Sequence, residues 1–394
     1  MAKETTDYYE ASLQLHALYK GKLEVSCKVP VKTNDDLSVV YSPGVAEPCM
    51  VIAKYPEEAR RYTIKANTIA IVSDGSSVLG LGNVGGLAAL PAMEGKAMLF
   101  KTFGEMDAFP ICLDTQDTDE IVGTVASIAP SFGGINLEDI AAPRCFVIEK
   151  RLKERLDIPV FHSNQHGVAV VVCAAVINAY KVLGKPLKAV RAVISGAGAA
   201  GNATAKMLFS LGVRDIVVCD SKGIIGVPRF SELNEDKLEL LEFTNRDGLA
   251  GGLAEAMIGR DLFIGLSKPN VLTHEMVRTM AMDPVIFAMS EPEPEITPDK
   301  AKAAGASITG TGRADFPNHI KSVLVTPGIF RGALDAEASE ITEEMKVAAA
   351  YALAGLVTEE ELTEDYILPP VFKEGVTAAV SEAVSAAWKE GRIK

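Results

Sequence analysis

An apolar run in the middle of the chain leads directly into a glycine-rich turn, and no other feature constrains the fold as strongly. Residues 190–195 read as a buried strand, and Gly196, Gly198 and Gly201 follow with G-x-G-x-x-G spacing. In such a turn the first glycine permits the tight bend, the second lets backbone approach a pyrophosphate, and the third lets the next helix pack closely. The sequence therefore predicts a dinucleotide-binding turn made of Gly196, Ala197, Gly198, Ala199, Ala200 and Gly201.

A second apolar run, residues 215–219, follows a helix expected at 202–211 and ends in Asp220. A carboxylate at this place accepts hydrogen bonds from ribose hydroxyls and repels a 2′-phosphate. Asp220 therefore favours NAD as the cofactor. Lys222 follows two residues later and could bind a phosphate as a point charge, so the use of NADP stays open.

Length and charge narrow the class of protein. A chain of 394 residues suffices for two domains, and a net charge of −13 argues against nucleic acid or anionic membrane as a partner. The six cysteines include no C-x-x-C pair, which argues against a zinc knuckle or a disulfide framework. We expect neither a signal peptide nor an apolar stretch able to span a bilayer, and hence a soluble cytoplasmic enzyme with a small-molecule substrate.

Alternating strand and helix patterns on both sides of the turn predict an α/β fold with parallel sheets. Short strands are expected at residues 68–72, 109–113, 145–148, 262–266 and 285–289. The expected organisation has an α/β catalytic and substrate domain at 1–165, a doubly wound parallel-sheet Rossmann domain at 166–345, and a C-terminal helical segment at 346–394 that packs back on the chain.

Five further sequence motifs lie before and after the glycine turn. They lie at residues 21–31, 40–49, 73–85, 133–140 and 328–335. Together they resemble the short bacterial type of malic enzyme, the family that oxidises and decarboxylates L-malate to pyruvate with NAD or NADP and a divalent metal. The resemblance covers nearly the whole chain and implies a homodimer with the N-terminal helices at its interface.

The resemblance also implies residue roles. It assigns the catalytic base to Lys96 in GluGlyLysAla, the acid to Tyr41 in TyrSerPro, and two ligands of Mg²⁺ or Mn²⁺ to Glu138 and Asp139. Carboxylates are the hard ligands that these ions prefer. Taken alone, Lys96 would read as a solvated helix lysine, Tyr41 as a structural tyrosine, and the acidic pair as an exposed loop or helix start.

This chain departs from the family at the expected metal and substrate positions. Ser163 and Asn164 replace two aspartates, and Asn164, at the third metal-ligand position, offers an amide oxygen without charge. Glu291 and Ser322 replace two substrate-binding asparagines, and Lys321 precedes the second of them. Losing a carboxylate should weaken metal binding. Either Glu291 restores the lost metal charge, or the substrate differs from malate.

Three functions follow from these residues. The leading hypothesis is NAD(P)-dependent oxidative decarboxylation of malate or a related 2-hydroxy acid. The alternatives are cofactor-independent decarboxylation of oxaloacetate, and a non-catalytic NAD-binding regulatory protein. His162 and His166 flank the altered pair; a structural role is expected for both, with recruitment as polar substrate contacts as the alternative.

Overall fold

The computed structural model describes residues 7–392, which form two parallel-sheet bodies joined by a buried helix. The first sheet has the order β2-β1-β3-β4, and all of its pairs are parallel. Its strands are β1 (Thr68–Ser73), β2 (Asp107–Cys112), β3 (Gly134–Leu137) and β4 (Val160–His162).

The second sheet has the order β10-β9-β8-β5-β6-β7, with only the β6–β7 pair antiparallel. Its strands are β5 (Arg191–Ser195), β6 (Asp215–Asp220), β7 (Gly223–Ile224), β8 (Leu262–Gly265), β9 (Val285–Ala288) and β10 (Ile308–Thr311). Because the order reverses beside β5, the carboxyl ends of β5 and β8 border a crevice where ligands bind in such sheets.

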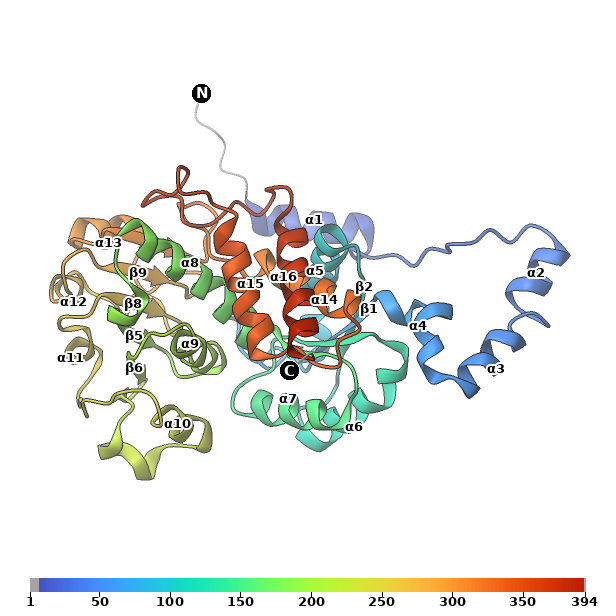
Figure 1. Cartoon of the computed structure of the whole chain (residues 1–394), viewed down its shortest axis with the longest axis horizontal. Helices are drawn as coiled ribbons and strands as arrows, with labels where there is room; N and C mark the ends of the chain where they lie inside the picture. The colour runs from blue at the N-terminus through green and yellow to red at the C-terminus, as the bar shows by residue number, and fades with distance from the viewer. Residues whose placement is uncertain (1–6, 393–394) are drawn as a thin grey trace.

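Helices cover both sheets (Figure 1). Those of the first half are α1 (Tyr8–Tyr19), α2 (Asn34–Val40), α3 (Ala46–Lys54), α4 (Ala59–Tyr62), α5 (Gly86–Gly104), α6 (Thr118–Ile128), α7 (Arg144–Arg155) and α8 (Val168–Val182). Those of the second half are α9 (Ala199–Ser210), α10 (Glu235–Leu240), α11 (Leu253–Met257), α12 (His274–Arg278), α13 (Pro298–Ala304), α14 (Thr326–Asp335), α15 (Glu343–Gly355) and α16 (Val376–Gly391).

Helix α8 forms the centre of the core. Every residue from Ala169 to Tyr180 is buried, and the helix packs against α9 and α15. By length and composition, the helical stretch Ser163–Val182 is apolar enough to cross a membrane, so the expectation of no such stretch was wrong. Of the apolar part of this stretch, 78% is buried inside the protein. The helix is apolar on all sides because it is surrounded by the core.

One expected strand is a helix. Residues 145–148 belong to α7, which begins after Pro143. Cys145, Ile148 and Leu152 are fully buried at helical spacing, and Glu149 is buried on the same side of the helix. A run of four apolar residues cannot distinguish a strand from a helix, because it is too short to show the period of either.

The C-terminal helices bind the two bodies together. Helix α16 packs on α14 and α15, and α14 also contacts α5 of the first body. Gly328 and Gly332 allow the close approach: a Cβ on them would come within 3 Å of Val380 and Val384 respectively. The expected domain boundaries at residues 165 and 345 remain predictions.

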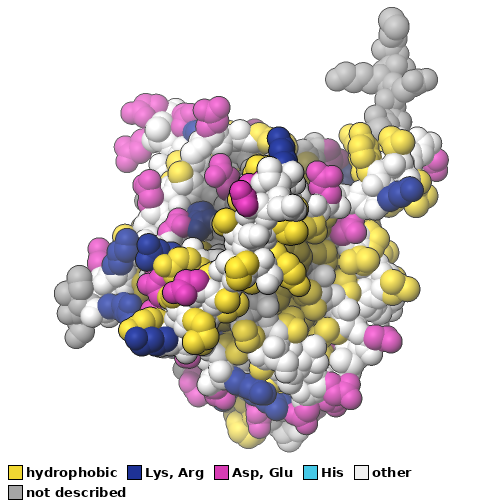
Figure 2. All heavy atoms as spheres, turned by 90° about the vertical axis from the view of Figure 1, so that its right-hand side faces the viewer, with side chains coloured by type: hydrophobic (Ala, Val, Ile, Leu, Met, Phe, Trp, Pro, Cys, Tyr) yellow, Lys and Arg dark blue, Asp and Glu magenta, His cyan; other side chains and the backbone are white. Residues whose placement is uncertain are grey.

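The segment 23–58, which we call the arm, projects from this body and carries α2 and α3 (Figure 1, right). None of residues 7–67 is buried. Apolar side chains nevertheless line the arm; Val25, Val39 and Met50 are 87%, 73% and 67% exposed. Figure 2 shows hydrophobic side chains gathered over the face from which the arm projects. Exposed apolar surface on this scale indicates an interaction surface.

Candidate active site

The glycine-rich turn has the geometry that its spacing predicts. Gly196 adopts φ 114°, a conformation that favours glycine, directly after β5. A Cβ on Gly201 would lie 1.8 Å from the carbonyl oxygen of Gly196, so only glycine fits there. Nothing lies within 4 Å of the Cβ position of Gly198, which leaves room for a ligand against the backbone and the N-terminus of α9.

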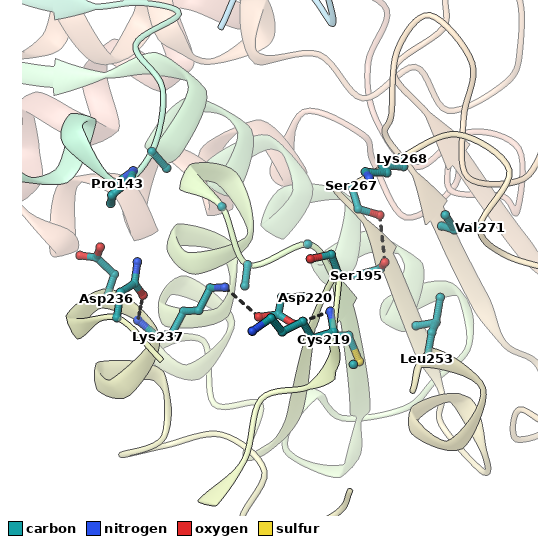
Figure 3. A pocket seen from close by; sticks show the side chains of 18 of the residues that line it. Pro143, Ser195, Cys219, Asp220, Asp236, Lys237, Leu253, Ser267, Lys268 and Val271 are labelled. Carbon is teal, nitrogen blue, oxygen red and sulfur yellow. Dashed lines mark hydrogen bonds and ion pairs between the residues drawn. The ribbon is translucent and has the colours of Figure 1, made fainter. Parts of the chain in front are cut away.

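A cavity of about 720 Å³ opens in front of this turn (Figure 3). The ends of β5 and β6 form one wall, and Ser195 and Ser267 are joined there by a hydrogen bond of 2.9 Å. Pro143 and Phe146 border it from the start of α7, so the cavity lies where the two bodies meet. Its size and its glycine-lined wall suit a dinucleotide.

Asp220 lies in the cavity but is fully engaged by neighbours. Its carboxylate accepts hydrogen bonds from both Nη atoms of Arg229 at 2.8 and 2.9 Å, from Lys237 Nζ at 2.7 Å and from the backbone of Lys222 at 2.9 Å. Burial alone would raise its pKa, but the bonds from Arg229 and Lys237 hold the pKa of Asp220 well below its usual value.

Lys96 and Glu138 form a buried ion pair in the first body. Lys96 Nζ, from α5, lies 3.2 and 3.1 Å from the two carboxylate oxygens of Glu138, which follows β3. Their side chains are only 13% and 10% exposed. Asn136 fixes the carboxylate further, by donating at 2.8 Å. The structure therefore excludes the solvated helix lysine as the description of Lys96.

Asp139 and Asn164 meet beside this pair. Asn164 donates to the Asp139 carboxylate at 3.0 Å and accepts from the Asp139 backbone N–H at 2.8 Å. Asp139 has a positive φ of 55°, which turns its side chain toward the loop that follows β4. Burial, reinforced by the charge of Glu138, raises the pKa of Asp139 to about 7.

These residues fit a hard divalent cation with two protein carboxylates. Glu138 and Asp139 are buried side by side, and Lys96 is the one cation that contacts either of them within residues 7–392. A Mg²⁺-type ion is commonly held by one or two carboxylates and otherwise by water and substrate. The amide oxygen of Asn164 already accepts a bond, and the described residues contain no cluster of three His, Cys, Asp or Glu side chains.

The loop that carries Ser163 and Asn164 is fixed by a buried charge network. Glu149 of α7 accepts from His166 Nε2 at 2.9 Å and from Gln165 at 3.1 Å, and Lys346 contacts His166 Nδ1 at 3.2 Å. Burial lowers the pKa of His166 to about 4, so the ring is neutral near pH 7. His162 is fully buried. Both histidines have structural surroundings, as expected.

Glu291 and Lys321 form an ion pair across two loops of the second body. A chain of contacts links this pair to the Lys96 cluster. On one side, a Cβ on Gly80 would come within 2.7 Å of the Glu291 carbonyl oxygen, and Ser77 of the same loop donates to the Asp139 carbonyl.

On the other side, Ser322 approaches Gly167, at the end of the loop that carries Asn164. Ser163 in that loop is buried and lies 3.4 Å from the hydroxyl of Thr326. The four positions that depart from the family, Ser163, Asn164, Glu291 and Ser322, thus belong to one chain of contacts that includes Asp139 and its neighbours Glu138 and Lys96.

Tyr41 does not join these contacts. It ends α2 on the arm, and 69% of its surface is exposed. The arm joins the body near Lys22, which donates to Glu94 and to the Pro91 carbonyl at 2.9 and 2.7 Å. Within one chain, the structure therefore does not bring Tyr41 together with Lys96.

Sequence reasoning missed Arg229, Lys237 and Glu149. The two cations follow Asp220 by 9 and 17 residues, and no motif ties them to it. Glu149 directly follows the segment 145–148, which was expected to be a strand, and a strand there gives no reason to place Glu149 beside His166. Recognition of α7 as a helix was the signal that could have placed Glu149 on the buried side, since it follows Cys145 by four residues.

Comparison with known proteins agrees with this architecture. Residues 20–153 match the family model of the malic enzyme N-terminal domain, and residues 165–388 match that of the malic enzyme NAD binding domain. A bifunctional malic/malolactic enzyme from Bacillus subtilis is 54% identical, over 97% of this chain and 93% of its own length. An NAD-dependent malic enzyme from Geobacillus stearothermophilus is 55% identical, over 94% and 77%.

A solved structure gives the same result for the fold. The NAD-dependent malic enzyme of Thermotoga maritima is 45% identical and superposes with a TM-score of 0.92, covering 97% of this chain and 99% of that one. The two-body α/β fold with a Rossmann-type second body is thereby confirmed. On both domain matches and on these relatives, the chain belongs to the malic enzyme family.

Proposed function

We propose that the chain catalyses the NAD(P)-dependent oxidative decarboxylation of L-malate, or of a closely related 2-hydroxy acid, with a divalent cation at Glu138 and Asp139. The observation that carries the proposal is the buried Lys96–Glu138 pair of the first body, in a chain that also has a coenzyme-sized cavity at the glycine-rich turn of the second. Neither a regulatory NAD-binding protein nor a simple hydrophobic core requires a lysine ammonium buried beside two carboxylates.

Each residue has a step in this reaction. After the Lys96 ammonium has given one proton to water, the neutral Lys96 Nζ can take the proton of the substrate hydroxyl, and Glu138 then holds the ammonium so formed in place. A coenzyme at the 196–201 turn would supply the hydride acceptor, and a divalent cation held by Glu138 and Asp139 would supply the positive charge that favours loss of carbon dioxide. Asn164 orients Asp139, and the Glu149 network keeps the Asn164 loop in position.

The altered cleft positions determine how well malate is used. The Glu291–Lys321 pair presents one anion and one cation where the family presents neutral amides. We therefore expect the quadruple variant S163D/N164D/E291N/S322N to raise kcat/KM for malate by about tenfold or more. Steady-state assays with Mn²⁺ and each coenzyme measure this. Efficient malate turnover by the unaltered chain, with no gain in the variant, contradicts a functional change at these positions.

We propose that Tyr41 acts in the cleft of a partner chain within a homodimer. Support comes from the arm: it carries Tyr41 away from its own Lys96, none of its residues is buried, and its exposed apolar side chains need a partner surface. In a two-fold dimer, two such arms can exchange between chains and complete both sites. The tyrosine hydroxyl then supplies the proton that the enol carbon requires.

Co-expression of two inactive variants distinguishes the partner's Tyr41 from the chain's own. Mixed dimers of Y41F and K96M contain one complete site if Tyr41 acts across the interface, so activity should return to about one quarter of the wild-type value. Inactive mixtures, with mixed dimers verified by mass, contradict this arrangement.

The reverse mixture is the control. Wild type co-expressed with the double variant Y41F/K96M has no complete site in its mixed dimers if Tyr41 acts in trans, but one complete site if it acts in cis. The expected specific activity is about one quarter in the first case and about one half in the second.

A further inference from the structure

We propose that Glu295 is a positioning residue that holds one wall of the coenzyme cavity and one wall of the substrate site in place together. The proposal rests on the proposed function, because it assumes that Glu291 lies at the substrate site. Glu295 lies in the loop after β9, has no exposed surface and takes no part in the proposed reaction. A buried carboxylate that contacts the lining of a ligand cavity is a candidate for a functional role.

The two carboxylate oxygens of Glu295 accept hydrogen bonds from two different loops. Oε1 accepts from the backbone N–H of Ser267, after β8, at 2.9 Å, and Oε2 accepts from the backbone N–H of Ser290, after β9, at 3.0 Å. Because β8 and β9 are neighbouring parallel strands, both N–H groups lie at the carboxyl edge of the sheet, where ligands bind in such folds. One side chain therefore joins the starts of two loops that leave this edge.

The groups that stabilise the charge of Glu295 are backbone N–H groups. Burial raises the pKa of Glu295, and the bonds from the Ser267 and Ser290 N–H groups oppose that rise. Burying a carboxylate is costly, but a neutral amide side chain has only one oxygen with which to accept from two N–H donors. The presence of a carboxylate here is therefore explained by the need to hold both loops with a single side chain.

Gly265, the last residue of β8, leaves the space that this carboxylate occupies. A Cβ on Gly265 would lie 2.3 Å from the Glu295 carboxyl carbon. Gly265 does not adopt a positive φ, so the close contact with Glu295, and not the backbone conformation, accounts for a glycine at the end of the strand.

On the coenzyme side, Glu295 fixes both ends of the segment 267–272. Its carboxylate accepts from the Ser267 N–H, and its carbonyl oxygen accepts from the Leu272 N–H at 3.1 Å. Ser267 lines the cavity, and its hydroxyl lies 2.9 Å from that of Ser195, directly before the glycine-rich turn (Figure 3). A shift of Ser267 would therefore change the cavity wall beside the turn where a pyrophosphate binds.

On the substrate side, Glu295 holds the residue that precedes Glu291. The bond from the Ser290 N–H joins the start of this loop to Glu295 near its end. Between these two points, Glu291 pairs with Lys321, and its carbonyl oxygen would lie 2.7 Å from a Cβ on Gly80 of the first body. Loss of the bond to Glu295 would therefore let Glu291 move relative to both of these neighbours.

The variant E295Q tests the need for two acceptor oxygens. Glutamine keeps the shape of the side chain, but one of the two backbone N–H groups then meets an amide group that cannot accept. We expect the Kd of NADH and the KM for malate each to rise about tenfold, because a buried donor loses its partner in each loop or in the loop joined to it. We expect kcat to change by less than about threefold, because the lysine and carboxylates of the first body are untouched.

Fluorescence titration of the full-length chain with NADH and steady-state assays with malate measure these constants, well below the melting temperature of each variant. Hydrogen exchange followed by mass spectrometry supplies a readout that needs no turnover. In E295Q, exchange should become faster in the segments 267–272 and 290–295 and stay unchanged in β5.

Two further variants separate positioning from stability. G265A pushes on the carboxylate without changing its chemistry, and it should raise the same two constants. D261N is the matched control, because Asp261 is a buried carboxylate at the opposite end of β8 and does not line the cavity. This variant should lower the stability of the protein and leave the Kd of NADH and the KM for malate unchanged.

Wild-type values of both constants in folded E295Q or G265A overturn the proposal, and so does a change in only one of the two constants. An increase in D261N as large as that in E295Q also overturns it, because a general loss of stability then explains the effect.

Failure of the proposed function gives a different result. If the unaltered chain binds NADH but oxidises no malate, the proposed function fails. The role of Glu295 is then decided by the NADH titration and by hydrogen exchange, and unchanged exchange in residues 290–295 of E295Q overturns it. A chain that binds no NADH overturns both proposals, because the coenzyme cavity would then be misassigned.

Discussion

At the scale of single residues, Lys96 is the group on which the proposed chemistry depends most directly. Replacing it in K96M removes the proton acceptor but keeps an aliphatic chain of similar length in the buried site. We expect kcat to fall by about 10²–10⁴-fold, the range typical of a lost general base. Exposed Lys101 on the same helix pairs with Asp107, and K101M should leave kcat unchanged. Coenzyme titration should show normal affinity in both variants.

Asp261 is a residue whose contribution to stability should depend on pH. Its side chain is 3% exposed and accepts from Lys185 at 2.5 Å and from the Arg191 backbone and side chain at 2.9 and 3.0 Å. Burial alone would raise its pKa, but the bonds from Arg191 and Lys185 hold the pKa of Asp261 below its usual value. The stabilisation is therefore present above the unfolded-state value and is lost as the pH falls through the folded-state value.

The variant D261N should accordingly lower the free energy of unfolding by about 3 kcal/mol at pH 7, because two cations lose a buried partner. Urea denaturation should give the same difference at pH 5 and a smaller one below about pH 4, where the carboxyl group becomes protonated. A control, D365N, breaks the exposed Lys302 pair and should change stability by less than about 1 kcal/mol. A D261N effect that grows toward acid pH contradicts this assignment.

Single residues also mark what sequence could predict of the site. Gly196, Gly198 and Gly201 were recognisable because the turn needs glycine at each of these places, and the three places lie close together in the sequence. The partners of Asp220 were not, since hydrogen bonds from Arg229 and Lys237 depend on how the loop and α10 after β6 fold back. The carboxylate therefore suggested a free acceptor at that position, although Arg229 and Lys237 already pair with it.

At the scale of elements, the β5–α9 turn offers a matched pair of substitutions. A Cβ on Gly201 would overlap the Gly196 carbonyl oxygen, whereas the same group on Gly198 meets nothing within 4 Å. We expect G201A to lower the melting temperature by several degrees, because the helix must move away from the strand. We expect G198A to keep the melting temperature and weaken coenzyme binding, because its methyl group enters the ligand space.

Calorimetry and coenzyme titration on both variants measure this separation. Normal coenzyme affinity in a fully stable G198A would show that the pyrophosphate does not approach residue 198. Wild-type stability of G201A would show that α9 packs less closely on the turn than is implied by the 1.8 Å between the Cβ position of Gly201 and the Gly196 carbonyl oxygen.

Elements differ in how much of them the sequence reveals. The strands β1, β5, β6, β8 and β9 carry well-bounded apolar runs, and each was expected at nearly its observed place. Residues 145–148 were assigned to a strand because four apolar or small residues carry no period of their own. Strands β3 and β4 are short, and the acidic and polar residues that follow them were visible only as family motifs.

At the scale of the whole molecule, the arm predicts the oligomeric state. Light scattering should give about twice the chain mass of 41.8 kDa. The double variant V39E/M50E places charges on exposed apolar residues of the arm and should dissociate the dimer. It should lose malate turnover and keep coenzyme binding, because the cavity lies in the body. M282E, at an 88% exposed residue outside the arm, is the control and should stay dimeric. A monomeric wild type with full activity contradicts this account.

The position of Tyr41 on the arm has a consequence for how the protein responds to dilution. If each active site needs the tyrosine of another chain, a monomer can be folded and bind its coenzyme and still be inactive. Initial rates should then fall faster than protein concentration once dimers begin to separate, and recovery on reconcentration should show a lag set by the meeting of two chains. A newly synthesised chain would be inactive until it formed a dimer with a second copy.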